Sequence, residues 1–478
     1  MAHRALLLVA VLGLLAVSPG VRAKGPDPIA QTIAKLVQQA GLGDGLGIHV
    51  VRLHDAEELY RNRPERPRNP ASNQKLLTSA AALRLLGPGF QMQTRVEGTI
   101  EDGRVAEMIV RPAGDPSFGY AQLAILAENL RLQGVKAADR VIIEDGYFDD
   151  QILPPAFEQQ PKEAASFRAA ISAFSVDRNS YLVSISPGAK VDEPAEVRVL
   201  AEGYARIDNR TMTSARGAPT PRIDHAAGED GHLAIRVEGS IPIKARTMYF
   251  RRRVPDPRAY SAHLFVRALG RAGIEVSSKA EHGTGLPSQP MIGQLYSPPL
   301  SKMLYSVGKW SDNFAAEMLV KVMGAEAETP GTSARGVQVV REELEKMGVD
   351  TGGLVMVNGS GLFDGNQVAP RHLTQTLVAA YRDPAMRAEY VAHLAVGGSD
   401  GTLAKRLEGL PRPRMVRAKT GTLRDVIALS GYVLGEPGRS VAFSYLANGI
   451  AGKQAEARQL ADDIVRALAD YAVGPGVR

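Results

Sequence analysis

Three short clusters of hydroxyl-bearing and amine-bearing residues occur in order along this 478-residue chain. They are Ser72-Asn73-Gln74-Lys75, Ser311-Asp312-Asn313 and Lys419-Thr420-Gly421. Together they offer a serine nucleophile, a lysine base, a second hydroxyl that can relay a proton, and a second lysine that can attract an anion. This set of groups predicts acyl transfer through a serine ester, a reaction that requires neither a metal ion nor a histidine.

The first cluster supplies the nucleophile and its base. Ser72 and Lys75 are three residues apart, so on a helix they share a face and their polar atoms come within reach of each other. The apolar sequence that follows predicts a buried helix from about Ser72 to Leu86. Burial and nearby cations would lower the pKa of Lys75, so that a neutral amine accepts the serine proton. A second Ser-x-x-Lys, residues 306–309, lacks this context and fits a helix cap with a surface lysine.

The second cluster would serve proton transfer and substrate binding. The Ser311 hydroxyl would carry a proton between Lys75 and a leaving amine. Asn313 would orient Lys75 and bind the substrate amide, whereas Asp312 would point away and be structural. Taken alone, the cluster also fits a helix N-cap with an aspartate in the first turn.

The third cluster lies in a predicted strand. Glycine inside a strand, here Gly421, often marks close approach by another group, and a peptide substrate can add alongside as a further strand. Lys419 would attract a terminal carboxylate, and the hydroxyls of Thr420 and Thr422 would bind it. The backbone N–H groups of Ser72 and Thr422 would form an oxyanion hole. Alone, this cluster also fits a β-turn.

The elements around the clusters follow from hydrophobic spacing. Helical spacing covers residues 29–39, 304–323, 337–347 and 455–471. Strand-like segments cover residues 46–53, 415–421, 426–434 and 441–448. From about residue 95 to residue 290, short β-like segments alternate with turns rich in Gly, Pro and Asp, which predicts one or two mainly β insertions.

Composition narrows the class of protein. The chain is 44% apolar and 23% charged, which is typical of a globular protein. It has no cysteine, so disulfides, thiolate metal sites and a cysteine nucleophile are excluded. Nine histidines without a His-Glu-x-x-His motif disfavour a metallopeptidase. The formal charge of +6 is modest and its basic residues are scattered, so we expect no nucleic-acid binding.

The N-terminus predicts export. A basic His3-Arg4 pair, an apolar run over residues 5–17 and Val21-Arg22-Ala23 fit a secretory signal peptide, residues 1–23, that is cut after Ala23. The run is shorter than the roughly 20 residues of a membrane span, and an uncleaved anchor is the alternative. No later stretch is long and apolar enough to span, so we expect no transmembrane segment in the mature chain and a periplasmic or cell-wall location.

The chain resembles the low-molecular-mass class C penicillin-binding proteins, which are the D-alanyl-D-alanine carboxypeptidases and endopeptidases of peptidase family S13. The resemblance covers nearly all of the mature chain and includes the long interval between Ser72 and Ser311. Matches beyond the three clusters are Pro70-Ala71, Gly114-Asp115-Pro116, Val176-Asp177-Arg178-Asn179, Ser297-Pro298-Pro299-Leu300, Phe314-Ala315-Ala316-Glu317, Gly359-Ser360-Gly361-Leu362, Asp400-Gly401-Thr402-Leu403 and Thr422.

The resemblance implies an α/β (α+β) fold of the β-lactamase/transpeptidase-like serine enzymes, with helices on an antiparallel sheet and two nested β-rich domains. The catalytic domain would comprise residues 24–95 and 290–474. The inserted region would be 96–289. It would divide into one subdomain of about 96–120 plus 200–289 and another of 121–199.

The resemblance also implies the reaction. The penultimate D-alanine carbonyl of a peptidoglycan stem peptide would acylate Ser72, D-alanine would leave, and water would hydrolyse the ester. DD-endopeptidase activity would be possible, β-lactams would act as covalent inhibitors on the same serine, and no cofactor would be needed. The catalytic residues carried over are Ser72, Lys75, Ser311, Asn313 and Lys419. Those carried over for substrate binding are Thr420, Gly421 and Thr422.

Two departures leave the stem-peptide preference open. Many relatives carry a Trp-x-Trp-Asp-Asp-like stretch whose acids read the free amino group of the stem, and residues 156–163 lack it. Asn358 replaces an acid that often precedes Gly-Ser-Gly-Leu. A β-lactamase-like hydrolase is the near alternative, disfavoured by the long insertion and the lack of a deacylating-glutamate motif. A non-catalytic cell-wall-binding protein is disfavoured by the intact nucleophile, base and relay. The oligomeric state stays open.

Overall fold

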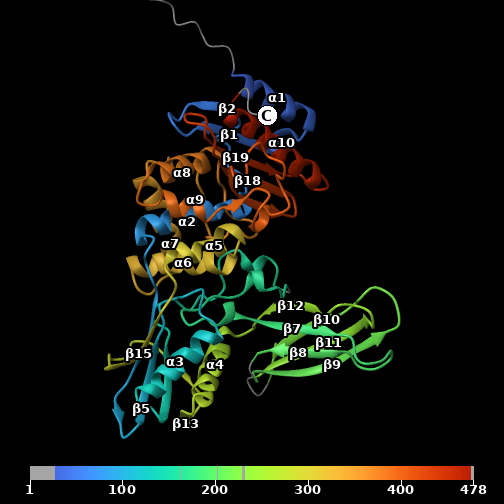
Figure 1. The fold of residues 1–478 in the computed structure, drawn as a ribbon. Coiled ribbons are helices and arrows are strands. Elements are labelled where there is room, and N and C mark those ends of the chain that lie inside the picture. Colours follow the sequence, from blue (N-terminus) through green and yellow to red (C-terminus); the bar gives the residue numbers. More distant parts are fainter. Residues whose placement is uncertain (1–26, 162, 202, 229–231, 475–478) are drawn as a thin grey trace, which may run out of the picture.

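The computed structural model describes residues 27–161, 163–201, 203–228 and 232–474 (Figure 1). The predicted signal peptide, residues 1–23, lies outside the described residues. Within these four stretches, no helix combines the length and apolar character that crossing a membrane requires.

A six-stranded antiparallel sheet forms the centre of the catalytic part of the chain. Its strand order is β16-β17-β18-β19-β1-β2. The strands are β1 (Leu46–Arg52), β2 (Glu58–Asn62), β16 (Ala395–Val396), β17 (Val416–Leu423), β18 (Val426–Val433) and β19 (Val441–Asn448). Every residue of β18 is buried, as expected for a central strand covered on both faces. Because β1 pairs with β19, the first and last parts of the chain share one sheet.

Helices cover both faces of this sheet, and the predicted arrangement of helices on an antiparallel sheet is confirmed. The helices α1 (Pro28–Ala40) and α10 (Gln454–Val473) pack on one face. The second group of helices lies against the other face (Figure 1). It comprises α2 (Gln74–Leu86), α5 (Leu300–Lys309), α6 (Asn313–Ala327), α7 (Ser333–Lys346), α8 (Pro370–Arg382) and α9 (Arg387–Ala392). The first ten residues of α2 are buried, so the expectation of a buried helix at this position is confirmed.

The single helix predicted over residues 304–323 is wrong, because the structure has two helices there, α5 and α6. The Asp312 carboxylate accepts a hydrogen bond from the Ala315 N–H at 3.2 Å and thereby caps the start of α6. Ser311 adopts φ 61°, in the left-handed region that breaks a right-handed helix. Apolar spacing continues across the break, so periodicity alone does not reveal it. The second cluster therefore lies on a turn between two helices.

The region between β3 and β15 is β-rich, as expected, and also contains two helices. Its largest sheet has seven strands, and two further sheets have three strands each, in the orders β12-β7-β8 and β10-β11-β9. The seven-stranded sheet contains β3 (Gln93–Glu97), β4 (Ile100–Glu101), β5 (Arg104–Arg111), β6 (Ala137–Glu144), β13 (Glu275–Val276), β14 (Glu281–Gly283) and β15 (Met291–Tyr296). The smaller sheets contain β7 (Ser180–Ser186), β8 (Glu196–Leu200), β9 (Ala205–Ser214), β10 (Arg222–Ala227), β11 (Leu233–Pro242) and β12 (Met248–Arg253).

The two helices of this region are α3 (Tyr120–Leu132) and α4 (Pro257–Arg271), which the sequence analysis did not predict. Asp256 followed by Pro257 is a helix-start signal, and the Asp256 side chain does cap α4. Because β3 pairs with β15, the chain enters and leaves the insertion side by side. The division of the insertion into two subdomains stays a prediction.

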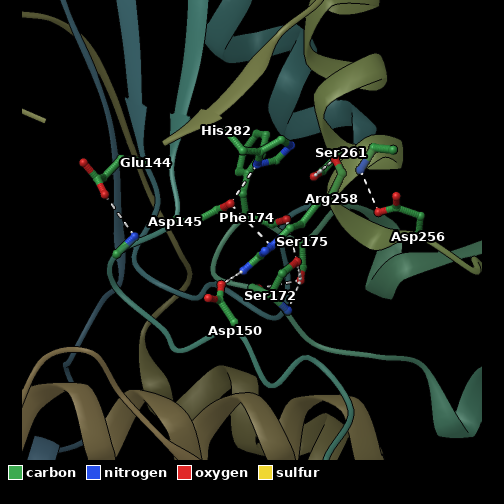
Figure 2. Close-up of polar contacts among 12 residues, drawn as sticks. Glu144, Asp145, Asp150, Ser172, Phe174, Ser175, Asp256, Arg258, Ser261 and His282 are labelled. Atoms are coloured by element: carbon green, nitrogen blue, oxygen red, sulfur yellow. Dashed lines mark hydrogen bonds and ion pairs between the residues drawn. The ribbon is translucent and has the colours of Figure 1, made fainter. Parts of the chain in front are cut away.

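Ionic contacts fasten the insertion to the catalytic helices. The Asp145 carboxylate lies 2.8 Å from His282 Nδ1 and 3.4 Å from Arg258 Nε. These contacts lie within the insertion and join the loop after β6 to β14 and α4 (Figure 2). Further along the same loop, the fully buried Lys321 of α6 pairs with Asp149 and donates to the Gln151 carbonyl at 2.7 Å. The 145–151 loop is therefore held from both sides.

A glycine at the crossing of α6 and α7 gives a stability prediction. A Cβ at Gly336 would lie 1.9 Å from the Val320 carbonyl oxygen. Gly336→Ala is therefore expected to lower the free energy of unfolding by about 2–3 kcal/mol, measured by urea unfolding followed by circular dichroism. The control is Gly270→Ala on α4, where nothing lies within 4 Å and a gain of roughly 0.5–1 kcal/mol is expected. Equal effects at both positions would contradict the close packing.

Candidate active site

The nucleophile of the first cluster lies on a tight turn that leads into α2. A 3₁₀ turn over Ala71–Asn73 continues directly into the helix. The Asn69 side chain accepts a hydrogen bond from the Ala71 N–H at 2.9 Å, and Asn448 of β19 accepts one from the Asn69 N–H at 2.8 Å. Ala71 adopts φ 44°, a strained value that surrounding contacts must hold. The sheet thus fixes the position of Ser72 at the start of α2.

Lys75 lies against Ser72 with its amine surrounded by three acceptors. Its Nζ atom is 3.0 Å from Ser72 Oγ, 2.7 Å from Asn313 Oδ1 and 2.6 Å from the Ser360 carbonyl oxygen. An ammonium group fills all three contacts. A neutral amine keeps two N–H groups for Asn313 and Ser360, and its lone pair then faces the Ser72 hydroxyl.

Burial makes the neutral form of this lysine accessible near neutral pH. Lys75 has no exposed surface, and burial lowers its pKa to about 7. The charges that act on it are the carboxylates of Glu317 and Asp312, which raise the pKa. Desolvation, and not the nearby cations invoked in the sequence analysis, therefore causes the decrease.

Ser311 and Lys419 form a second hydroxyl–amine pair beside the first. Lys419 Nζ donates to Ser311 Oγ at 2.9 Å and to the Thr420 carbonyl at 2.7 Å. Lys419 is fully buried, and desolvation, followed by the charge of Lys75, places its pKa well below the usual value. Lys419, which is predicted to attract a terminal carboxylate, thus contacts the Ser311 hydroxyl directly.

The hydroxyls face a cavity of about 780 Å³. Its walls include Ser72, Ser311, Asn313, Thr422, Leu423, Gln159, Gln160, Phe167 and Gly361–Asp364. The insertion supplies Gln159, Gln160 and Phe167. The Phe167 carbonyl accepts a hydrogen bond from Asn313 Nδ2 at 3.0 Å, and Gln159 Nε2 donates to the Asp364 carbonyl at 2.9 Å. The cavity is therefore shared between the catalytic part and the insertion.

Strand β17 offers a partly open edge at this cavity. On that edge, β16 pairs only with Ala418 and Arg417, so within the described parts of the chain residues 419–423 have no strand partner there. The sequence predicts that another group approaches the strand at Gly421. In the structure that group is the turn before Ser72, because a Cβ at Gly421 would lie 3.0 Å from Ala71 Cβ and 3.1 Å from the Pro70 oxygen.

The second Ser-x-x-Lys does not form a similar pair. Ser306 Oγ donates to the Met303 carbonyl at 2.9 Å. Lys309 Nζ donates to the Leu394 carbonyl at 3.0 Å and to Asp400 at 2.7 Å. These contacts join α5 to the strand and turn that follow α9, so this motif is structural here.

Several contributors to the site had no assigned role in the sequence analysis. The Ser360 carbonyl and the Glu317 carboxylate lie in stretches that carried the family resemblance, yet a carbonyl and a buried acid give no motif of their own. Arg178 of the insertion pairs with Asp312 at 3.1 Å and so contacts the second cluster. In the part of the chain that the structure describes, no three or more His, Asp or Glu side chains group so as to hold a metal ion.

Comparisons with known proteins show the family of this chain. Residues 29–471 match the family described as D-Ala-D-Ala carboxypeptidase 3 (S13). The chain is 36% identical to the D-alanyl-D-alanine carboxypeptidase of Actinomadura sp. strain R39, over 98% of this chain and 91% of that protein. It is 28% identical to D-alanyl-D-alanine carboxypeptidase DacB of Haemophilus influenzae, over 81% of this chain and 82% of that protein.

Solved structures share the fold. The crystal structure of penicillin binding protein 4 (dacB) from Haemophilus influenzae matches with a TM-score of 0.78 at 24% identity, covering 91% of this chain and 98% of that chain. A predatory peptidoglycan endopeptidase of Bdellovibrio bacteriovorus, Bd3459, matches with a TM-score of 0.51 at 15% identity, over 90% and 94% of the two chains. The family match and the first relative together show that this chain belongs to the D-Ala-D-Ala carboxypeptidase 3 (S13) family.

Proposed function

We propose that this protein is a serine-type D-Ala-D-Ala carboxypeptidase that cleaves peptidoglycan stem peptides outside the cytoplasmic membrane. The observation that carries the proposal is the buried amine of Lys75, 3.0 Å from a Ser72 hydroxyl that opens on a cavity. The names of the S13 relatives support the same substrate class. The predicted signal peptide supports export to the periplasm or cell wall.

In the proposed acylation step, Ser72 Oγ attacks the carbonyl carbon of the penultimate D-alanine and its proton passes to the neutral Lys75 amine. The N–H groups of Ser72 and Thr422 stabilise the oxyanion of the tetrahedral intermediate. The Ser311 hydroxyl relays the proton to the nitrogen of the terminal D-alanine, which leaves as the C–N bond breaks. Water then hydrolyses the Ser72 ester by the same groups, releasing the shortened peptide and restoring the serine.

The open edge of β17 supports a place for the substrate. A stem peptide lying along residues 419–423 would add a strand to the sheet and direct its terminal carboxylate toward Thr420 and Thr422. The Lys419 amine, which donates to Ser311 Oγ, lies next to this part of β17. We assign Thr420, Gly421 and Thr422 to substrate binding on this basis.

β-Lactams would form the same ester on Ser72. A structure of the Haemophilus influenzae protein holds a β-lactam. A DD-endopeptidase activity on cross-linked stems is a second candidate, favoured by the cavity of about 780 Å³ and its open strand edge. Digestion of purified cross-linked and uncross-linked muropeptides separates the two activities.

The proposal is tested with the mature chain, residues 24–478, and a synthetic peptide ending in D-Ala-D-Ala. We expect release of D-alanine, no release from the matched peptide ending in D-Ala-L-Ala, and loss of activity after stoichiometric treatment with benzylpenicillin. Failure to release D-alanine would contradict the proposal. A penicilloyl ester that hydrolyses within seconds would instead favour a β-lactamase.

The pH dependence of acylation follows from Lys75. Below its pKa of about 7 the amine is protonated and cannot accept the Ser72 proton, and above it the base is free. The rate constant of acylation by fluorescent penicillin is therefore expected to rise about tenfold per pH unit below pH 7 and to level off above it. Stopped-flow labelling between pH 5 and pH 9 measures this rising part of the pH profile, which is called the acid limb below. A flat profile would contradict the role of Lys75 as the base.

A further inference from the structure

Glu317 is a buried carboxylate close to the catalytic groups but outside the cavity wall. It lies on α6 four residues after Asn313, so both side chains project from the same face of the helix. It is 1% exposed, and its two oxygens accept hydrogen bonds from the N–H groups of Gly359 at 3.1 Å and Ser360 at 2.8 Å. Burial raises the pKa of Glu317, whereas the hydrogen bonds from Ser360 and Gly359 and the charge of Lys75 lower it and so favour the ionised form.

The two-residue segment Gly359–Ser360, called the Gly359–Ser360 peptide below, links this carboxylate to Lys75. The Ser360 carbonyl accepts a hydrogen bond from Lys75 Nζ at 2.6 Å, and the Gly359 carbonyl accepts one from Thr78 Oγ1 at 2.8 Å. The peptide is therefore bonded to α2 through its carbonyls and to α6 through its N–H groups. Glycine is needed at position 359, because a Cβ there would lie 2.4 Å from Val320 Cγ2.

We propose that Glu317 is a positioning residue for the catalytic base: it fixes the Gly359–Ser360 peptide against α6, and the Ser360 carbonyl then aims the Lys75 amine at Ser72. The inference rests on the proposed function of Lys75. A neutral amine has two N–H groups, and Asn313 and Ser360 hold both of them. Displacing the Ser360 carbonyl leaves one N–H free, and the lone pair then turns away from the serine hydroxyl.

Glu317 also acts on the base through its charge. Its carboxylate raises the pKa of Lys75 and partly offsets the effect of burial, which lowers that pKa. Removing the charge therefore moves the acid limb of acylation to lower pH. Shortening the side chain to aspartate keeps the charge but moves the carboxylate, and this impairs the alignment of the Lys75 amine with Ser72. Geometry and charge can thus be separated by two substitutions.

The test compares Glu317→Gln and Glu317→Asp with the wild type, and uses Glu343→Gln as the matched control. Glu343 is also a buried helical glutamate, 4% exposed on α7, but its partner is Lys346. In Glu317→Gln, the amide NH₂ faces a backbone N–H and cannot accept its hydrogen bond. We expect its acylation rate above pH 8 to fall at least tenfold and its acid limb to move below that of the wild type. Glu317→Asp should lose a similar factor and keep the limb near pH 7.

Rates are expressed per folded molecule, so that a loss of stability alone does not count. A Glu317→Gln variant with the plateau and limb of Glu343→Gln would overturn the inference, even if its melting temperature falls. If Glu317→Gln does not fold, Glu317→Asp decides, and a plateau within twofold of the wild type would overturn it. If penicillin does not label the wild-type protein at Ser72, the result would contradict the proposed function itself and not only the role of Glu317.

Discussion

Replacing Ser72 with alanine is expected to abolish covalent labelling by fluorescent penicillin and to reduce D-alanine release by about 10⁴-fold or more. The reason is that Ser72 carries the hydroxyl that lies 3.0 Å from the amine of Lys75, the proposed base. Ser311 Oγ, the other cluster hydroxyl on the cavity wall, already accepts a hydrogen bond from Lys419. The change removes one hydroxyl from a partly exposed turn, so the fold should be retained. Gel fluorescence and mass spectrometry of the labelled peptide measure the effect.

The chain provides its own control for this substitution. Ser306→Ala alters the other Ser-x-x-Lys, whose hydroxyl donates to the Met303 carbonyl within α5. It should leave labelling and D-alanine release within about twofold of the wild type, because Ser306 is not one of the residues that line the cavity. Undiminished labelling of Ser72→Ala, or its loss in Ser306→Ala, would show that the nucleophile has been misassigned.

The part of the site that follows from helix geometry was predictable from sequence. The three-residue spacing of Ser72 and Lys75 on a buried helix predicts their contact and the lowered pKa of the lysine. Strand-like segments were likewise expected over residues 415–421 and 426–434, where the structure has β17 and β18. In both cases the determining interactions are local, so a short window of sequence contains them.

Other parts depend on contacts between distant segments. The turn at Ser311 is an exception, because its cap by Asp312 is local and the helix N-cap pattern of this cluster already indicates it. The Ser360 carbonyl reaches Lys75 across 285 positions of sequence. The Phe167 carbonyl reaches Asn313 from the insertion. Backbone carbonyls carry no residue-type signature, so sequence could not assign these two roles.

Gly421 illustrates how a correct motif can have a different physical cause. A glycine inside a strand predicts close approach by another group, and a substrate strand is one group that could lie there. The structure instead places the Pro70–Ala71 turn against it. The glycine therefore lets the nucleophile turn pack against a face of β17, whereas the edge of residues 419–423 away from β18 has no strand partner among the described residues. The same residue type thus serves assembly of the site more directly than substrate contact.

Replacing Lys75 with arginine is expected to lower the acylation rate constant by about 10³-fold at every pH, because a guanidinium stays protonated and cannot act as the base. Arginine keeps the positive charge that Lys75 carries below its pKa of about 7, so the comparison at low pH is made at equal charge. Lys309→Arg is the matched control, since that lysine is bonded to Asp400 away from the cavity wall. Its acylation should stay within about twofold of the wild type. Stopped-flow labelling from pH 5 to pH 9 compares the three proteins.

The shape of the pH profile identifies the base more strictly than the rate does. If Lys75 is the base, Lys75→Arg removes both the plateau and the limb near pH 7, leaving a slow and flat profile. A limb that persists near pH 7 in Lys75→Arg would contradict this assignment and move the role to Lys419. That amine is fully buried, its pKa is also lowered, and it is bonded to Ser311 Oγ. The two lysines differ in which serine they contact, so the surviving limb decides between them.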